Sequence, residues 1–234
     1  MTSPAGSRPD VGVVIVAAGA GVRAGPGEPK QFRPILGVPM LLRALRPFTS
    51  HPAVGQVVVA VPAGFEVRPP EWLGKLAGER LAVVAGGATR AQSVQAGLRA
   101  LPTHAAVVLV HDGARPFVTR ETIDAVVAKA RSGVGAVAAI PVSDTVKDVE
   151  QERIIRTVAR DRLWRAQTPQ GFPRAMLERA YGGLAAGDPA PTDDAELCEH
   201  AGFAVDVVPD SPYNLKVTTA EDFRLAEALA RELR

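Results

Sequence analysis

The stretch Val11-Gly12-Val13-Val14-Ile15-Val16-Ala17-Ala18 is the one on which the fold prediction depends. It is an unbroken apolar run, rich in β-branched side chains, with no alternation of polar and apolar positions. Such a run is typical of a strand that is buried on both faces of a parallel sheet. It is also far shorter than the ~20 apolar residues that a membrane-spanning helix needs.

Similar runs recur along the chain and alternate with helical patterns. Further strands are predicted over residues 56–61, 81–85, 105–110, 135–141 and 204–208. Helices are predicted over residues 39–48, 90–101, 119–131, 173–184 and 220–233. This alternation favours an α/β fold, with a mostly parallel twisted sheet and helices on both faces in a Rossmann-like arrangement. Because no linker is evident, we expect a single domain over residues 1–234.

Composition narrows the function classes. The formal net charge is only +2 and no dense Lys/Arg tract is present, so neither nucleic-acid nor membrane binding is expected. Cys198 is the single cysteine, which excludes an internal disulfide. The polar start over residues 1–10 does not have the pattern of a secretory signal, and a cytoplasmic location is therefore expected.

The segment Ser143–Arg160 departs from the strand–helix alternation. It alternates charged and β-branched residues, which predicts an extended hairpin with its turn near Glu150–Glu152. The hairpin has too few apolar residues to bury a face within its own domain. It could be a protruding arm that packs on a second subunit, or an ordinary solvated edge hairpin, and the pattern alone does not separate the two.

The loop after the first predicted strand contains a possible dinucleotide fingerprint. Gly19, Gly21 and Ala24 satisfy the pattern G-x-G-x-x-A. However, the prolines and glycines that follow at once would prevent a helix from starting there. Residues 36–48 also contain no acidic side chain that could hold a ribose. Both features argue against NAD binding.

A phosphate-binding loop fits the same residues better. Small residues let backbone N–H groups approach a polyphosphate closely, and Arg23 and Lys30 flank the Gly/Pro-rich turn. Two such cations could clamp phosphate oxygens and neutralise the charge that builds up on a leaving pyrophosphate. A surface loop with two solvated cations is the alternative for this loop taken alone.

The first loop, followed by Pro29-Lys30-Gln31, resembles the signature loop of the nucleotidyltransferases that activate sugars and polyols. With the segments below, nearly the whole chain is similar to the 2-C-methyl-D-erythritol 4-phosphate cytidylyltransferase family of non-mevalonate isoprenoid biosynthesis. The resemblance implies transfer of a cytidylyl group from CTP to that polyol phosphate, with release of pyrophosphate. It implies that Arg23 and Lys30 are catalytic. It also implies a nucleotide-binding backbone at Ala17, Ala18, Gly19 and Gly21.

A second glycine-containing loop precedes the predicted helix that begins at residue 90. Gly86 and Gly87 leave backbone N–H groups accessible just before the helix N-terminus, and Thr89 is expected to be the N-cap. An ordinary helix start would have the same pattern. The family resemblance implies that Gly87 and Ser93 hold the pyrimidine base.

The run His111-Asp112-Gly113-Ala114-Arg115-Pro116 ends another parallel strand, so the Asp112 carboxylate should point into the ligand crevice. Mg²⁺ prefers one or two carboxylates together with waters and substrate phosphates, which suits Asp112. A simple ion pair between Asp112 and Arg115 is the structural alternative. His111 has no second His or Cys at ligand spacing, which argues against zinc. The resemblance implies that Asp112 binds the metal, with Arg115 beside it at the substrate.

The resemblance also implies an acceptor site. Thr145 and Arg160, on the predicted arm, and Thr192 would contact the second substrate, partly across the interface of a homodimer. Thr192 is in addition expected to be a helix N-cap. Lys216, in Asn214-Leu215-Lys216-Val217-Thr218, would be the third catalytic cation and would bridge the phosphates and the acceptor. Trp164 is expected to pack, with a turn following at residues 168–170.

No nucleophile motif is present, so we expect direct in-line attack by the acceptor's phosphate, which is already ionised and needs no general base. Catalysis would depend on positioning and on charge stabilisation by cations and Mg²⁺. Three alternatives remain open: a sister cytidylyltransferase for ribitol 5-phosphate or another polyol phosphate, a dinucleotide-dependent oxidoreductase, and a catalytically silent nucleotide-binding protein.

Overall fold

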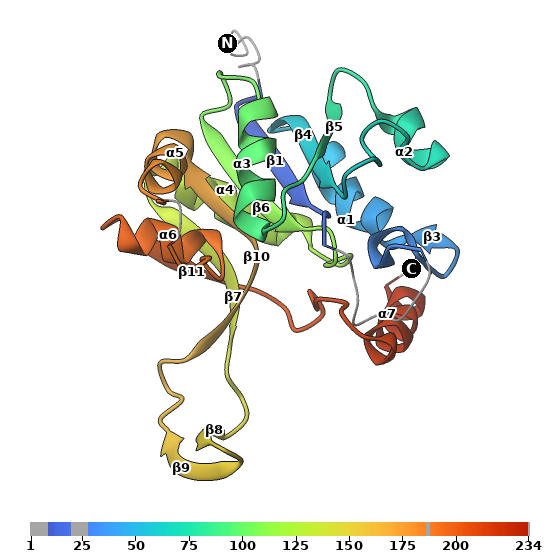
Figure 1. Cartoon of the computed structure of the whole chain (residues 1–234). Coiled ribbons are helices and arrows are strands. Elements are labelled where there is room, and N and C mark those ends of the chain that lie inside the picture. The colour runs from blue at the N-terminus through green and yellow to red at the C-terminus, as the bar shows by residue number, and fades with distance from the viewer. Residues whose placement is uncertain (1–8, 20–27, 186–187, 234) are drawn as a thin grey trace, which may run out of the picture.

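The computed structural model describes residues 9–19, 28–185 and 188–233, and its centre is a seven-stranded sheet with the order β11-β7-β10-β6-β1-β4-β5 (Figure 1). The strands are β1 (Val11–Val16), β4 (Val54–Val61), β5 (Leu81–Ala85), β6 (Val107–Asp112), β7 (Gly135–Pro141), β10 (Trp164–Pro173) and β11 (Val205–Pro209). Strand β1 pairs in parallel with β4 and β6, β4 with β5, and β7 with β11. The mostly parallel sheet predicted from the apolar runs is therefore confirmed.

The exception is β10, which runs antiparallel to both of its neighbours, β6 and β7. No strand was predicted here, because the segment contains two prolines and several polar residues, and a turn was expected at residues 168–170. The structure instead has a bulge between Ala166 and Gln170 within one continuous strand. Gln167, Thr168 and Gln170 are all buried. Each finds a hydrogen-bond partner from another segment, which is what makes a polar strand tolerable in the core.

Helices cover both faces of the sheet. They are α1 (Met40–Thr49), α2 (Glu71–Leu76), α3 (Arg90–Ala100), α4 (Arg120–Arg131), α5 (Arg174–Gly182), α6 (Asp194–His200) and α7 (Ala220–Glu232). Val13 and Ile15 of β1 belong to the apolar cluster that α1 and α4 cover, whereas Val14 belongs to the cluster under α3, α5 and α6. This alternation follows from the two-residue period of a strand. Helix α7 packs instead beside the short pair β2 (Pro34–Ile35) and β3 (Val38–Pro39).

Most predicted elements agree with the structure to within two residues at each end. The short elements α2, β2 and β3 were not predicted, because two to six residues carry too little periodicity. Helix α6 begins at Asp194, one residue later than an N-cap at Thr192 would place it. Its N-cap is Asp193, whose carboxylate accepts from the Glu196 N–H at 2.9 Å, so the assignment of Thr192 as N-cap was wrong. Thr192 instead donates its hydroxyl to Glu196 at 2.8 Å.

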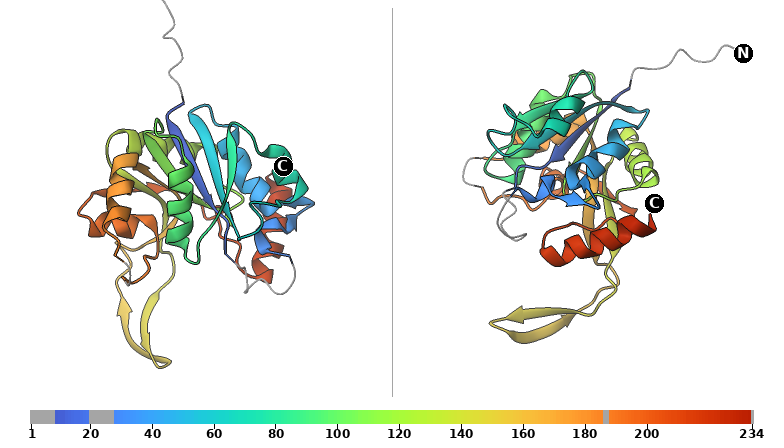
Figure 2. Two further views of the ribbon diagram at one scale, coloured as in Figure 1. Left: turned by 45° about the horizontal axis from the view of Figure 1, so that its top comes forward. Right: turned by 90° about the vertical axis from the view of Figure 1, so that its right-hand side faces the viewer.

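The predicted hairpin is a separate two-stranded sheet of β8 (Val146–Glu150) and β9 (Arg153–Val158), which projects from the body (Figures 1 and 2). Gln151 and Glu152 make its turn with φ angles of 46° and 66°. The apolar side chains of the arm, Val149, Ile154 and Ile155, are each more than half exposed in the single chain. Trp164, expected to pack, is 41% exposed at the base of the arm.

Among the described residues, none of the helices combines the length and apolar composition that crossing a bilayer requires.

Candidate active site

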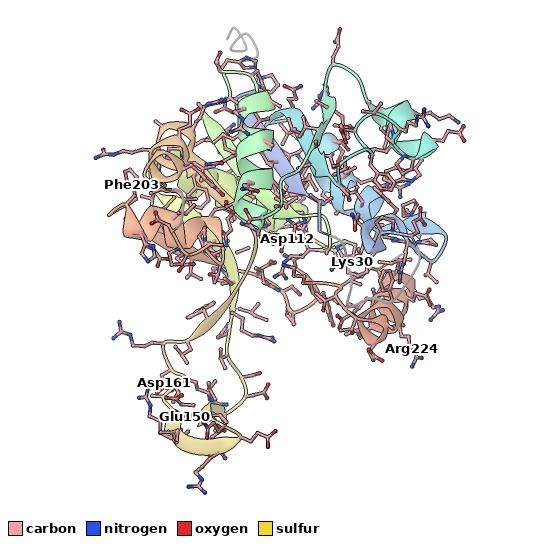
Figure 3. All side chains as sticks on the ribbon, viewed as in Figure 1. Lys30, Asp112, Glu150, Asp161, Phe203 and Arg224 are labelled. Carbon is pink, nitrogen blue, oxygen red and sulfur yellow. The ribbon has the colours of Figure 1, made fainter. Side chains whose placement is uncertain are left out.

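The carboxyl ends of β1, β5 and β6 meet at one edge of the sheet and surround a cavity of about 560 Å³. This is the edge at which ligands bind in open parallel sheets. The cavity is lined by residues that were predicted from four separate segments, namely Ala17, Ala18, Gly19, Lys30, Gly87, Ser93, Asp112 and Lys216. Figure 3 shows Lys30 and Asp112 on the same edge of the body, with Glu150 and Asp161 of the arm region well apart from them.

Asp112 is the last residue of β6, and its side chain is 10% exposed at the cavity wall. Its Oδ2 lies 2.8 Å from the Lys216 Nζ and 3.8 Å from the Arg115 Nε, and its Oδ1 lies 3.4 Å from the Arg90 Nε. Burial alone would raise the pKa of this carboxyl, but Arg90, Lys216 and Arg115 together hold the pKa well below its ordinary value. Asp112 is therefore negatively charged at neutral pH. Within the described chain it is the sole acidic side chain lining the cavity.

Lys30 and Lys216, the two predicted catalytic lysines, lie at the same wall of the cavity. Lys216 is 43% exposed, so its ammonium group remains accessible from the cavity. Lys30 begins a short 3-10 turn and donates its Nζ hydrogen to the Val217 carbonyl at 2.9 Å, directly beside Lys216. The next residue, Gln31, is buried and donates to the Ala17 carbonyl at 2.7 Å. The end of the first loop is thus tied to both the β1 terminus and the segment before α7.

The glycine loop after β5 provides a backbone-lined wall. The Gly87 N–H donates to the Ser93 Oγ at 3.1 Å, and that hydroxyl donates to the Thr89 carbonyl at 3.0 Å. Thr89 is the N-cap of α3 and forms a capping box with Gln92, as predicted. At Gly86 a Cβ atom would lie 2.3 Å from the Ala18 Cβ, so the loops after β1 and β5 approach too closely for a larger residue. The two predicted base-binding residues therefore belong to one rigid turn.

Arg115 lies behind the cavity and is not among the residues that line it in the described part of the chain. Its guanidinium is 10% exposed, pairs with Asp112, and donates to the Asn214 carbonyl at 2.7 Å. This geometry suits a residue that supports Asp112 better than a residue that contacts a substrate directly.

His111 is completely buried, and burial lowers its pKa to about 4, so it is neutral at neutral pH. Its Nε2 lies 3.1 Å from the Arg115 carbonyl, which can only accept, so Nε2 carries the hydrogen. Nδ1 must then accept from the Thr168 hydroxyl at 3.0 Å, and that hydroxyl accepts the Asp112 N–H, also at 3.0 Å. His111 therefore holds the loop around Asp112 in place and is not available as a general base. The described residues contain no cluster of three or more His, Cys, Asp or Glu side chains that could hold a metal by themselves.

Arg90 is a site residue that the sequence analysis did not single out. It is the first residue of α3, lines the cavity, and pairs with both Asp112 and Asp194. Burial alone would lower the pKa of Arg90, but the two carboxylates raise it, so the guanidinium stays charged. Its place in the G-G-x-x-R spacing was the available signal, but a spacing does not reveal which carboxylates a side chain will meet.

The predicted acceptor residues do not line the cavity of their own chain in the described structure. Thr145 and Arg160 are exposed on the arm, where Arg160 donates to the Ser143 carbonyl. Thr192 is exposed just before α6. Arg23 and Gly21, both predicted at the phosphate-binding loop, lie outside the described residues.

Comparisons with known proteins identify the family of the chain. The family model for 2-C-methyl-D-erythritol 4-phosphate cytidylyltransferase matches residues 11–232. The chain is 47% identical to the enzyme of that name from Salinibacter ruber, an alignment that covers 93% of this chain and 91% of the relative. It is 44% identical to the one from Streptomyces coelicolor, covering 92% and 83%.

Solved structures agree as well. The crystal structure of the 2-C-methyl-D-erythritol 4-phosphate cytidylyltransferase from Thermus thermophilus superimposes with a TM-score of 0.77 at 37% identity, and covers 95% of this chain and 99% of that one. The crystal structure of 4-diphosphocytidyl-2C-methyl-D-erythritol synthase from Anaerococcus prevotii gives a TM-score of 0.81 at 28% identity, covering 96% and 100%. The chain therefore belongs to the 2-C-methyl-D-erythritol 4-phosphate cytidylyltransferase family.

Proposed function

We propose that this enzyme transfers the cytidylyl group of CTP to 2-C-methyl-D-erythritol 4-phosphate, giving 4-diphosphocytidyl-2-C-methyl-D-erythritol and pyrophosphate. The family assignment supports this acceptor over ribitol 5-phosphate, and it supports a transferase over an oxidoreductase. The observation that carries the proposal is that Lys30, Lys216 and Asp112, far apart in sequence, line one cavity at the carboxyl edge of a parallel sheet.

The cavity walls suggest how CTP lies. The turn at Gly87 and Ser93 would hold the cytosine, because its small residues leave room for a small ring while the Gly87 N–H stays bonded to the Ser93 Oγ. Ala17, Ala18 and Gly19, with Gly21 beyond the described residues, would place backbone N–H groups along the triphosphate. Lys30, Lys216 and Arg23 would then neutralise charge on the leaving pyrophosphate.

The attacking group would be the phosphate of the acceptor, directed in line at the α-phosphorus of CTP. The bond from that phosphate oxygen to the α-phosphorus forms as the bond to the β-phosphate oxygen breaks, and pyrophosphate leaves with its electron pair. A phosphate is already ionised at neutral pH, so the reaction needs no proton acceptor. The cavity fits this requirement, since the histidine nearest to it is buried and neutral. Lys216 would contact both the phosphates and the acceptor as the third catalytic cation, and its 43% exposed side chain in the cavity lining supports that function.

Mg²⁺ is the proposed metal, and the donor set of the cavity suits it. One carboxylate, Asp112, together with triphosphate oxygens and water, is a usual arrangement for nucleotide-bound Mg²⁺. The ion would share Asp112 with Lys216, or displace the Lys216 ammonium from the carboxylate. When bound, the metal would supply charge neutralisation at the phosphates.

We further propose that the enzyme acts as a homodimer in the cytoplasm. The arm leaves the body at the end of β7 and the start of β10, at the same edge of the sheet as the cavity. It exposes Val149, Ile154 and Ile155, and its Thr145 and Arg160 do not line the cavity of their own chain in the described structure. An arm that packs on a second copy would bury those apolar side chains and bring Thr145 and Arg160 to the partner's acceptor site. Light scattering during size-exclusion chromatography should give twice the monomer mass, and a monomer at assay concentration would contradict the dimer.

The function is tested by measuring pyrophosphate release with Mg²⁺, each of the four nucleoside triphosphates, and a panel of polyol phosphates. We expect release with CTP and 2-C-methyl-D-erythritol 4-phosphate. Release with ATP in place of CTP would refute the cytosine site. Release with ribitol 5-phosphate alone would transfer the assignment to the sister enzyme.

A further inference from the structure

Arg90 lines the cavity, yet the proposed chemistry gives it no function. Its side chain is 22% exposed and reaches from the N-terminus of α3 to two carboxylates on different elements. Nη1 lies 2.7 Å from the Asp194 Oδ2, and Nε lies 3.4 Å from the Asp112 Oδ1. The planar guanidinium therefore connects the end of β6 with the start of α6.

The Asp194 end of this connection is rigid. Asp194 has no exposed surface, and the Tyr181 hydroxyl donates to its Oδ1 at 2.6 Å. The N–H groups of Asp194 and Ala195 both donate to the Oε1 of the buried Gln170 at 3.1 Å. Tyr181 of α5 thus holds the carboxylate and Gln170 of β10 holds the backbone that carries it, so Arg90 is anchored from behind the cavity wall.

The two cavity-lining cations that contact Asp112 differ in exposure and in the partners that hold them. Lys216 approaches Oδ2, is 43% exposed, and is the group that must also reach the phosphates. Arg90 approaches the other oxygen, Oδ1, and is held by Asp194. If Lys216 turned toward the phosphates of CTP, Arg90 would still contact Oδ1 and keep the carboxylate in its orientation.

We propose that Arg90 is a positioning residue for cytidylyl transfer, which holds the Asp112 carboxylate toward the nucleotide while it is itself anchored by the buried Asp194. This proposal rests on the proposed function, since it assumes that Asp112 acts on CTP or its bound metal. Groups that orient a ligand-binding carboxylate commonly change affinity or activity 10- to 100-fold, roughly, when they are replaced.

The decisive comparison is between Arg90→Met and the double variant Arg90→Met/Asp194→Asn. The single variant leaves a buried carboxylate without its cation, so we expect a lower melting temperature as well as lower activity. The double variant removes both charges and should recover most of the melting temperature. Its kcat/KM for CTP should nevertheless stay at least about tenfold below wild type, with weaker CTP binding by calorimetry, because Asp112 has lost its support. Recovery of kcat/KM together with stability would overturn the proposal and leave Arg90 a structural role only.

A second variant covers the case in which the double variant does not fold. Arg90→Lys keeps the positive charge but replaces the planar fork by a single ammonium, which cannot serve both carboxylates equally. We expect a folded protein with reduced affinity for CTP, and wild-type activity in this variant would also overturn the proposal. Arg99→Met, an exposed arginine on the same helix, is the control and should change neither quantity. Failure of the proposed function would be seen differently, as absence of pyrophosphate release from CTP by the wild-type enzyme.

Discussion

At the scale of single residues, the site depends on keeping one carboxylate charged in a largely buried place. Three cations from three segments surround Asp112, and their attraction exceeds the cost of burying the charge, which is why its pKa is lowered. Such an arrangement leaves the cavity with excess positive charge from Lys30 and Lys216. That excess suits a polyanionic ligand better than a neutral one.

Lys30→Ala should lower kcat by about 10² to 10³ while the protein stays folded, because it removes a cation that is aimed at developing negative charge. The measurement is pyrophosphate release with CTP, accompanied by the circular dichroism spectrum and melting temperature. Lys129→Ala is the control, since that lysine pairs with Asp206 on the surface at 2.7 Å. Near-normal turnover of Lys30→Ala would show that the first loop is wrongly assigned.

His111 predicts a pH dependence of stability. Its pKa is about 4 in the folded protein against an ordinary value of 6.5, so between these values the unfolded chain binds more protons than the folded one. The free energy of unfolding should therefore fall as the pH is lowered from 6.5 to 4, by at most about 3 kcal/mol from this residue. Urea denaturation at several pH values would measure it. In His111→Gln this part of the slope should disappear, and an unchanged slope in that variant would contradict the assignment.

At the scale of elements, polar segments shape the site as much as apolar ones. Strand β10 lies between β6 and β7, and its buried Thr168 and Gln170 hold the Asp112 backbone and the start of α6. The capping box of α3 has a similar effect on the glycine loop, because Thr89 and Gln92 fix the turn that contains Gly87. A helix cap here serves both stability and the shape of the cavity.

Thr89→Ala should therefore affect two quantities at once. Loss of the cap should cost about 1 kcal/mol of unfolding free energy, and the loosened turn should raise the KM for CTP several-fold. Thr119→Ala removes the N-cap of α4 at a residue that does not line the cavity in the described structure, and should cost similar stability without changing KM. Denaturant unfolding and steady-state kinetics on both variants test this, and equal KM values for the two would argue against the glycine loop as the base site.

At the scale of the whole molecule, the arm and the cavity lie at one edge of the sheet, yet the arm residues assigned to the acceptor do not line the cavity in the described structure. On the proposed assignment of Thr145 and Arg160, the acceptor site would be completed by the arm of a second copy. A two-fold symmetric pair would give each cavity the arm of the other subunit.

Subunit mixing tests this exchange directly. If the arm is exchanged as proposed, Lys30→Ala should inactivate the cavity of its own subunit and Arg160→Ala that of its partner, so each homodimer should be nearly inactive. In a hybrid, one cavity keeps Lys30 and also receives an intact arm, so random mixing should restore about a quarter of wild-type activity. No recovery, with hybrid formation verified by mass spectrometry, would show that the arm serves its own chain. Lys30→Ala mixed with Lys216→Ala is the contrasting pair, since both lesions lie in the cavity: each hybrid cavity keeps one of them, and no recovery is expected.

The apolar runs were sufficient to predict the parallel sheet, because a strand buried on both faces has to be apolar throughout and few other segments are. The motif residues were sufficient to predict half of the residues that line the cavity, since the carboxyl ends of parallel strands share an edge. Only the tertiary structure revealed β10 as a core strand, because its polar side chains are satisfied by partners distant in sequence. Only the structure showed that Arg90 lies between Asp112 and Asp194, because these partners are also distant in sequence. Arg90 precedes Asp112 by 22 residues, and the three residues belong to three different elements.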